Sequence, residues 1–244
     1  MGQLTLEHVS KSYGQNHVLE DITLTVDEGE FVSIVGPSGS GKSTIFQLIG
    51  GLFPPDSGTL SLDETVLNNR RGHISYMPQS PALFPWRTVL QNVELSAEIS
   101  GTKQDTQKAL ELIRGAGLAG YEKAYPSELS GGMKQRVSFI RSLNAPQSII
   151  CLDEPFSALD EFTRLEMQLW LLSIWETYRK SVLFITHNID EALFLSDRIV
   201  ILSDKPAVVK KEIIVPFERP RSEELLLSEP FLTLKKEIYN NLRG

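Results

Sequence analysis

The stretch Gly36–Thr44, "GPSGSGKST", decides the fold. It matches the pattern G-x-x-x-x-G-K-[ST] at four positions, namely Gly36, Gly41, Lys42 and Ser43. In this pattern the glycines let backbone N–H groups surround phosphates, the lysine adds positive charge and the hydroxyl can bind Mg²⁺. An apolar run, "EFVSIVG", precedes it, and "KSTIFQLIGGLF" follows with helical spacing up to a Gly-Gly pair. Strand, glycine loop and helix in this order predict a phosphate-binding P-loop.

Strand and helix patterns alternate on both sides of the P-loop. The runs "LTLEHV" and "HVLEDITLTV" alternate apolar and polar residues, as half-buried strands do, and "GTLSLD" and "HISYMPQ" are further short strands. Later, "SIICLDEP" and "SVLFITH" flank a long helical segment over 161–178, and "IDEALFLS" precedes the strand "DRIVILSD". This alternation predicts an α/β fold with a mainly parallel sheet and a site at the carboxyl ends of its strands.

The segment 88–145 has helical patterns only, unlike the alternating strands and helices on either side of it. Its runs "TVLQNVELSAEIS", "KQDTQKALELIRGAGL" and "GMKQRVSFIRSLNA" all have helical spacing, and no convincing strand lies between them. We therefore expect a helical insertion in the α/β core.

Two adjacent carboxylates, Asp153 and Glu154, end the apolar run "SIICLDEP". At the end of a buried strand, Asp153 suits the coordination shell of Mg²⁺, and Glu154 suits a general base that polarises an attacking water. The alternative is a pair that caps a helix. Cys151 lies inside the buried run, and we interpret it as a core residue and not as a redox group.

Composition excludes several classes of protein. The net charge of −7 and the pI near 5.2 argue against a nucleic-acid-binding protein, which usually carries a basic face. The single cysteine allows no internal disulfide. There is no apolar signal core, and no apolar run reaches the roughly 18 residues of a membrane span. We expect a soluble cytoplasmic chain that reaches a membrane only through a partner.

A second phosphate-site pattern lies at Leu129–Val137, "LSGGMKQRV", where a serine and two glycines precede a helix. This run resembles the signature motif of ATP-binding cassette (ABC) ATPases. The family's companion motifs follow in its order: an aromatic that stacks on adenine in "KSYG", the Q-loop glutamine in "YMPQ", the D-loop "SALD" and the switch histidine in "ITHN". The resemblance therefore covers nearly the whole chain.

The resemblance implies a site shared between two cassettes. In ABC ATPases two cassettes face each other head to tail, and the signature of one closes over the γ-phosphate held by the P-loop of the other. A chain with two incomplete half-sites fits that arrangement. ATP with Mg²⁺ would hold two copies together, and hydrolysis would release them.

The resemblance also assigns roles to individual residues. It implies ATP contacts from Tyr13, Val18, Gly36, Pro37, Ser38, Gly39, Ser40, Gly41, Lys42, Ser43 and Thr44. It implies catalytic roles for Gln79, Glu154 and His187, and Mg²⁺ contacts from Ser43, Gln79 and Asp153. It implies ATP contacts in trans from Ser130, Gly131, Gly132 and Gln135, with Ser157 and Asp160 in the D-loop. One departure is Asn188, which follows His187 where importers often carry an aspartate; we expect no loss of activity from it.

The family fold divides the chain as follows. We expect one ABC ATPase domain over 1–244 with a P-loop core, an N-terminal antiparallel β subdomain and an inserted helical subdomain. The core and the β subdomain take 1–87 and 146–215, the helical signature subdomain takes 88–145, and 216–244 is a tail that packs on the core or on a second subunit.

The loop "SPALFPWRTVLQNV" indicates the partner. Phe84 and Trp86 could cover the insertion's own core, or they could form a groove for a helix of a permease. The run is similar to a stretch of the nitrate, sulfonate and taurine importer group, which also serves thiamine precursors. We therefore expect the ATP-hydrolysing subunit of an importer of a small solute. Its partners would be a second cassette, transmembrane permease subunits and, indirectly, a solute-binding protein, with no nucleic acid. It would lie at the cytoplasmic face of the membrane.

Other functions remain open at this point. A soluble ABC ATPase of a non-membrane assembly, such as iron–sulfur cluster building, would carry the same catalytic motifs. DNA-repair members carry long coiled coils and translation members usually carry two cassettes, and this chain has neither. An exporter half fits the Trp-containing loop less well. A P-loop nucleotide kinase would not explain "LSGGMKQR" or "SALD".

Overall fold

A six-stranded sheet forms the centre of the molecule. The computed structural model describes residues 2–157 and 159–243. Within them the sheet has the order β10-β9-β3-β8-β7-β6, and all neighbours are parallel except β10 and β9. Its strands are β3 (Phe31–Val35), β6 (Ser75–Met77), β7 (Ile149–Asp153), β8 (Ser181–Ile185), β9 (Arg198–Leu202) and β10 (Val209–Ile214). The predicted α/β fold with a mainly parallel sheet is confirmed.

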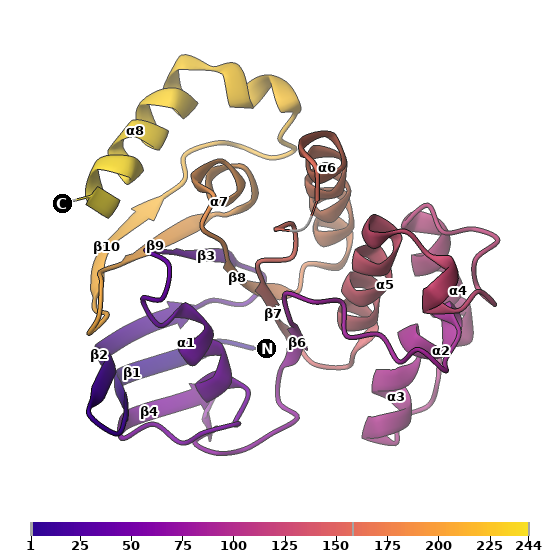
Figure 1. Cartoon of the computed structure of the whole chain (residues 1–244), viewed down its shortest axis with the longest axis horizontal. Helices are drawn as coiled ribbons and strands as arrows, with labels where there is room; N and C mark the ends of the chain where they lie inside the picture. Colours follow the sequence, from indigo (N-terminus) through magenta and orange to yellow (C-terminus); the bar gives the residue numbers. More distant parts are fainter. Residues whose placement is uncertain (1, 158, 244) are drawn as a thin grey trace.

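A separate antiparallel sheet lies beside the first (Figure 1). It has the order β2-β1-β4-β5, with β1 (Leu4–Tyr13), β2 (Asn16–Val26), β4 (Ser57–Leu62) and β5 (Thr65–Val66). The alternating burial of β1 and β2 follows the apolar and polar alternation of their sequences. The two-residue strand β5 is too short to leave a periodic pattern, and sequence analysis missed it.

The helices surround the sheets (Figure 1). Over 88–145 there are only helices among the elements: α2 (Val89–Val93), α3 (Leu95–Ser100), α4 (Thr106–Gly115), the 3₁₀ turn η1 (Pro126–Glu128) and α5 (Gly131–Asn144). The others are α1 (Lys42–Ile49), α6 (Glu161–Tyr178), α7 (Ile189–Leu195), η2 (Glu223–Leu227) and α8 (Glu229–Arg243). The run "TVLQNVELSAEIS", expected as one helix, is two, and they meet at Glu94. The domain boundaries stay a prediction.

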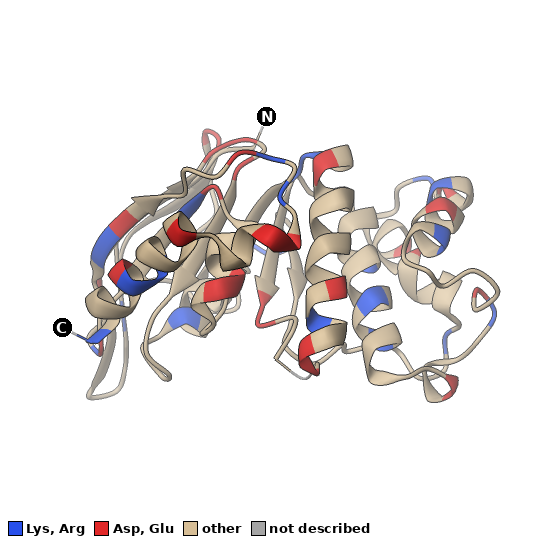
Figure 2. Ribbon diagram, turned by 90° about the horizontal axis from the view of Figure 1, so that it is seen from above, with Lys and Arg blue, Asp and Glu red and all other residues tan. Residues whose placement is uncertain are grey.

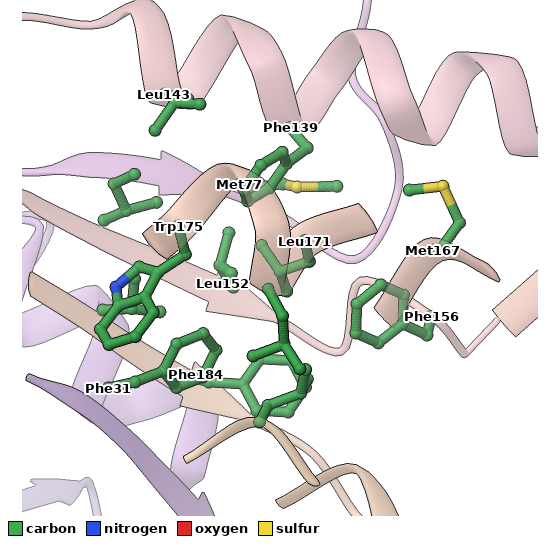
Figure 3. Packing of buried hydrophobic residues seen from close by; sticks show 14 of the residues in the cluster. Phe31, Met77, Phe139, Leu143, Leu152, Phe156, Met167, Leu171, Trp175 and Phe184 are labelled. Atoms are coloured by element: carbon green, nitrogen blue, oxygen red, sulfur yellow. The ribbon is translucent and has the colours of Figure 1, made fainter. Parts of the chain in front are cut away.

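Hydrophobic side chains pack on both faces of the central sheet. Successive residues of a strand point to opposite faces. On β3, Phe31 therefore joins the cluster under α6, while Val32 and Ile34 join the cluster that contains α1. Figure 3 shows the first cluster. In it the Phe31 ring makes T-shaped contacts with the rings of Trp175 and Phe184, at centroid distances of 5.7 and 5.9 Å. Burial on both faces explains why "FVSIV" is apolar throughout.

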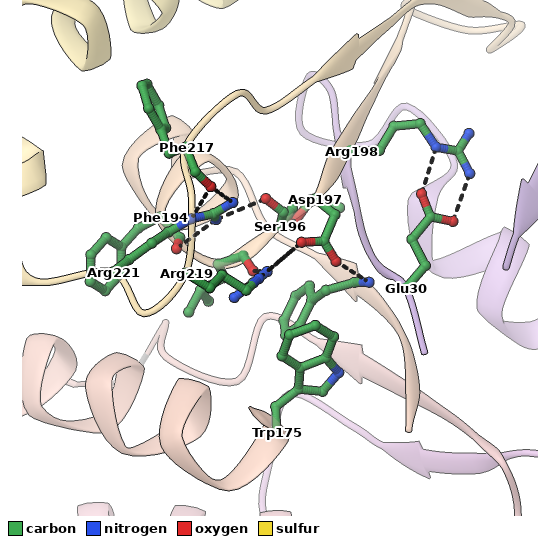
Figure 4. Close-up of polar contacts among 12 residues, drawn as sticks. Glu30, Trp175, Phe194, Ser196, Asp197, Arg198, Phe217, Arg219 and Arg221 are labelled. Atoms are coloured by element: carbon green, nitrogen blue, oxygen red, sulfur yellow. Dashed lines mark hydrogen bonds and ion pairs between the residues drawn. The ribbon is translucent and has the colours of Figure 1, made fainter. Parts of the chain in front are cut away.

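The tail is anchored to the core by two arginines (Figure 4). Arg221 is buried and donates to the main-chain carbonyls of Leu193, Phe194 and Ser196 at the end of α7. Arg219 donates to the Asp197 carboxylate, and its guanidinium lies 4.3 Å from the centre of the Trp175 ring. Beyond them, α8 buries Phe231 and Ile238 in the larger hydrophobic cluster. The tail thus packs on the core of its own chain.

Charged residues are mixed over the surface. Figure 2 shows Lys and Arg interspersed with Asp and Glu along the outer helices. In the described part of the chain, no helix combines the length and the apolar character that a membrane crossing requires.

Candidate functional site

A cavity lies at the carboxyl ends of neighbouring parallel strands. It has a volume of about 670 Å³. The loops that follow β3, β7, β8 and β6 all reach it, because these strands are neighbours in the sheet. Its walls are Ser38, Gly39, Gly41, Lys42, Ser43, Thr44, Gln79, Asp153, Glu154, His187 and Lys205. Tertiary structure thus gathers residues that are more than 100 positions apart in the chain.

The P-loop requires glycine at its tightest point. Gly41 precedes α1 with φ of 115°, and a Cβ atom there would lie 2.9 Å from side-chain atoms of Leu19 and Val18. The next residue, Lys42, folds back, and its ammonium donates to the carbonyls of Gly36 at 2.8 Å and Pro37 at 2.7 Å. Burial lowers the pKa of Lys42, and the charges of Glu154 and Asp153 oppose that shift. These carbonyl bonds hold the lysine at the cavity, where it can exchange them for phosphate oxygens.

Asp153 is a carboxylate held in a nearly buried position. It is 8% exposed, and burial raises its pKa above the usual range. The Tyr76 hydroxyl donates to its Oδ2 at 3.0 Å. This bond, a hydrogen bond from Ser43 and the charge of Lys42 act in the opposite direction and favour the ionised form. A carboxylate that is desolvated in this way gains from a cation beside it.

Glu154 lies at the centre of a group of polar side chains. Its Oε2 is 3.3 Å from His187 Nδ1 and accepts a hydrogen bond from Gln79 Nε2 at 3.3 Å. Ser157 donates to the main-chain carbonyl of Glu154 at 2.9 Å. Glu154 itself has φ of 44°, in the left-handed region that costs a non-glycine residue about 1 kcal/mol or more. The fold therefore keeps a strained backbone that places this carboxylate beside His187 and Gln79.

The segment after β8 presents His187 to the cavity. Asn188 begins α7, and its side-chain oxygen accepts from the main-chain N–H groups of Asp190 at 2.8 Å and Glu191 at 3.4 Å. An aspartate would cap α7 in the same way, so the departure at Asn188 is structurally conservative. Below it, Thr186 donates to the buried Glu191 carboxylate at 2.5 Å.

Some predicted ATP-binding residues lie outside the cavity walls. Tyr13 packs edge-on against Phe53, and its hydroxyl donates to Gln47 at 3.3 Å. Val18 is buried behind Gly41. Gly36, Pro37 and Ser40 form the rear of the P-loop and do not line the cavity. The cavity thus contains the phosphate end of the expected site, while Tyr13 lies beyond it.

The signature residues lie apart from the cavity of their own chain. Ser130 caps α5 by accepting from the Met133 N–H at 3.3 Å, and it is exposed together with Gly131. Gly132 is half-buried, and a Cβ there would lie 3.4 Å from Thr163. None of the signature residues lines the 670 Å³ cavity.

Gln135 is buried, unlike Ser130 and Gly131. It is 2% exposed, and its side-chain amide donates to the main-chain carbonyl of Gln79 at 3.3 Å. This side chain therefore faces the Q-loop of its own chain, and its contact with a second cassette stays a prediction. Sequence pattern could not separate it from the exposed signature residues, because only the turn of α5 decides which way it points.

The D-loop residues Ser157 and Asp160 are exposed, and Asp160 caps α6 by accepting from the Thr163 N–H at 3.1 Å. Ala158 of "SALD" lies outside the described residues.

The loop that contains Phe84 and Trp86 leaves the Trp86 side chain exposed. The indole is 69% exposed, and its ring centre is 5.2 Å from that of Phe84. Asn92, which is fully buried, holds the loop, because it accepts from the Phe84 N–H and donates to the carbonyls of Phe84 and Arg87. A rigid loop with an exposed indole is typical of a contact surface more than of an internal core.

Sequence analysis missed two residues of the site. Lys205 lines the cavity from the loop after β9, which is held on β2 by hydrogen bonds between Ala207 and the main chain of Val18 and Glu20. Tyr76 reaches Asp153 from the neighbouring strand. No motif marks Lys205. No motif marks the role of Tyr76 either, because its bond to Asp153 depends on the pairing of β6 with β7.

Comparisons with known proteins agree with this geometry. The ABC transporter family model matches residues 19–157. The chain is 41% identical to the formylaminopyrimidine import ATP-binding protein ThiZ of Halalkalibacterium halodurans, over 96% of this chain and 94% of that protein. It is 40% identical to the aliphatic sulfonates import ATP-binding protein SsuB of Bacillus cereus, over 95% and 91%. The chain therefore belongs to the ABC transporter family, as an ATP-binding and ATP-hydrolysing cassette.

A solved structure has the same fold. The dimeric structure of MJ0796, a bacterial ABC transporter cassette, superposes with a TM-score of 0.76 and 34% identity, over 88% of this chain and all of that one. The resemblance to ABC ATPases that the motifs predicted is confirmed.

Proposed function

We propose that this chain is the ATP-hydrolysing subunit of an importer that takes up a small solute through a separate permease. The observation that carries the proposal is the cavity, which brings the P-loop, Asp153, Glu154, Gln79 and His187 together. The importer names of two relatives, a formylaminopyrimidine and an aliphatic sulfonates subunit, support import and a small heterocyclic or anionic solute. They favour this function over a soluble cassette of a non-membrane assembly.

The residues present fit a site for Mg²⁺ with a nucleotide. No group of three or more His, Cys, Asp or Glu in the described ranges could hold a metal alone. A magnesium site that uses one or two protein oxygens and the substrate phosphates needs no such group. The buried carboxylate of Asp153, whose pKa burial raises, and the adjacent Ser43 hydroxyl are suitable ligands, and Gln79 lies across the cavity. When bound, Mg²⁺ would neutralise phosphate charge.

Side chains of this chain would bind the phosphates, accept the proton and orient the attacking water. Lys42 would leave the carbonyls of Gly36 and Pro37 and bind phosphate oxygens. Glu154 would accept the proton of the attacking water, because it is the more exposed of the two carboxylates that line the cavity. His187 and Gln79, each 3.3 Å from Glu154 Oε2, would orient the water and the γ-phosphate. Tyr13 and Val18 would bind the base end of the nucleotide.

The site would be completed by a second copy of the chain. Ser130, Gly131 and Gly132 lie at the exposed N-terminus of the 14-residue helix α5, where main-chain N–H groups favour an anion. Since they do not reach the cavity of their own chain, the phosphate that they bind would be held by the other copy. Ser157 and Asp160 of the D-loop would lie along the same interface. The dimeric cassette of similar fold supports this arrangement.

The permease would meet the loop at Phe84 and Trp86. An exposed aromatic pair on a rigid loop suits a helix-in-groove contact. This contact would hold the chain at the cytoplasmic face of the membrane, with a solute-binding protein acting on the other side.

The first experiment tests the shared site. Glu154→Gln should bind ATP without hydrolysing it, and light scattering with and without Mg-ATP measures its mass. We expect a monomer that becomes a dimer only with Mg-ATP, and that stays monomeric when Ser130→Trp is added. A protein that binds ATP and stays monomeric would contradict the shared site between two copies. Failure to bind ATP would contradict the nucleotide site itself.

A further inference from the structure

Tyr76 lies on β6, the edge strand of the central sheet, and its side chain reaches the Asp153 carboxylate at the cavity. In the parallel register Tyr76 pairs with Cys151 on β7. Asp153 lies two residues further along β7, so its side chain points to the same face as that of Cys151. The tyrosine hydroxyl spans this offset and donates to Asp153 Oδ2 at 3.0 Å.

The Tyr76 ring is fixed from its other side. It lies nearly perpendicular to the Phe46 ring of α1, with a centroid distance of 5.9 Å and an interplanar angle of 87°. Since α1 begins at Lys42, the helix that carries the P-loop also packs on the ring that reaches Asp153. The ring that carries the hydroxyl is therefore held by the helix that follows the P-loop.

The Tyr76 hydroxyl does not point to solvent, although the residue is partly exposed. Tyr76 is 39% exposed, and its ring forms part of the wall of two surface cavities of about 330 and 200 Å³. A half-exposed tyrosine usually directs its hydroxyl to water. Here the hydroxyl instead donates to a carboxylate that burial has desolvated.

We propose that Tyr76 is a positioning residue that fixes the orientation of the Asp153 carboxylate, the group that would bind Mg²⁺. Hydrogen bonds to a ligating carboxylate orient it, and their loss typically weakens metal binding tenfold or more. The inference rests on the proposed role of Asp153 as a ligand of Mg²⁺. Ser43 also donates to Asp153, so the carboxylate would be held from the P-loop and from the edge strand together.

The test is the Mg²⁺ dependence of ATP binding. In the Glu154→Gln background, radiolabelled ATP binding is measured while Mg²⁺ is titrated, with and without Tyr76→Phe. Phenylalanine keeps the ring, its contact with Phe46 and the walls of both cavities, and removes only the hydroxyl. We expect the Mg²⁺ midpoint to rise about tenfold, with ATP binding in EDTA unchanged.

Tyr178→Phe is the matched control, because its ring lies at the end of α6 and outside the cavity walls; its midpoint should stay at that of the parent. Equal midpoints for Tyr76→Phe and the parent, with ATP bound normally, would overturn the positioning role alone. If the parent itself binds no ATP, the proposed function fails and the positioning role with it. A comparable loss in EDTA and in Mg²⁺ would indicate general damage to the site and would also overturn the proposal.

Discussion

Two helix N-termini in this molecule resemble each other in sequence and differ in what surrounds them. The N-terminus of α1 follows a glycine-rich loop inside the cavity, where Lys42, Asp153 and Glu154 meet. The N-terminus of α5 follows Ser130 at the exposed surface and lies outside that cavity. The first has its charged partners in its own chain, whereas the second offers only main-chain groups and a hydroxyl. This contrast is what the proposed shared site requires: the α1 end would bind the chain's own nucleotide, and the α5 end would bind that of a second copy.

The largest expected effect is on the α1 side. Glu154→Gln removes the proposed general base and keeps the shape of the side chain, so ATP turnover should fall by about 10² to 10⁴. Phosphate release under saturating ATP measures it, and Glu166→Gln on the exposed face of α6 is the matched control. Turnover within a few-fold of the parent would assign the base to another group and weaken the contrast.

Paired glycine substitutions compare the two ends directly. In Gly41→Ala the new Cβ would meet Leu19 and Val18 at 2.9 Å in a backbone with φ of 115°, which should cost roughly 1–3 kcal/mol and abolish ATP binding. In Gly131→Ala the new Cβ meets no atom within 4 Å, so the monomer should keep its stability and its ATP binding. Urea denaturation and equilibrium ATP binding measure both variants. Loss of ATP binding in monomeric Gly131→Ala would place the signature within the chain's own site.

Asp153→Asn should separate stability from function. The folded state raises the pKa of Asp153 because the carboxylate is buried, so it keeps the proton to higher pH than the unfolded chain does. Burying the ionised Asp153 carboxylate costs folding free energy. That cost is absent below the unfolded pKa of about 4, where the group is protonated in both states, and is complete above the raised pKa of the folded state. The variant should therefore melt at higher temperature than the parent at neutral pH, by about 1 kcal/mol in stability, and bind Mg-ATP more weakly.

Thermal melts across pH 3 to 8 without nucleotide check this, with the exposed Asp204→Asn as control. A difference that persists unchanged at low pH would mean that burial of the charge is not its cause.

The smallest expected effect is on the α5 side. Ser130→Ala removes the cap that accepts from the Met133 N–H, which should cost about 1 kcal/mol in the free energy of unfolding. Because no titratable side chain is part of this cap, the loss should be the same across neutral and mildly acidic pH. Ser130→Asp should restore it. A loss of several kcal/mol would show that the α5 end is as tightly integrated as the α1 end.

Local patterns predicted most of the fold for identifiable reasons. The run "FVSIV" is apolar because both faces of β3 are buried, and the segment 161–178 has the length and spacing of α6. Local patterns failed where contacts with distant parts of the chain set the length of an element or the direction of a side chain. Glu94 divides one expected helix into two, β5 is only two residues long, and Gln135 turns inward to Gln79.

The sequence by itself determined which chemistry is present: a phosphate loop at Gly36–Thr44, the carboxylates Asp153 and Glu154, and a second glycine-rich helix start at Ser130. Only the tertiary structure decided how these groups meet. The order β3-β8-β7-β6 brings His187, Glu154 and Gln79 to one edge, Tyr76 reaches Asp153 across a strand, and Ser130 is left outside. The physical reason is that motifs are set by short-range backbone geometry, whereas strand order and helix direction are set by burial of the sheet's two faces, which involves the whole chain.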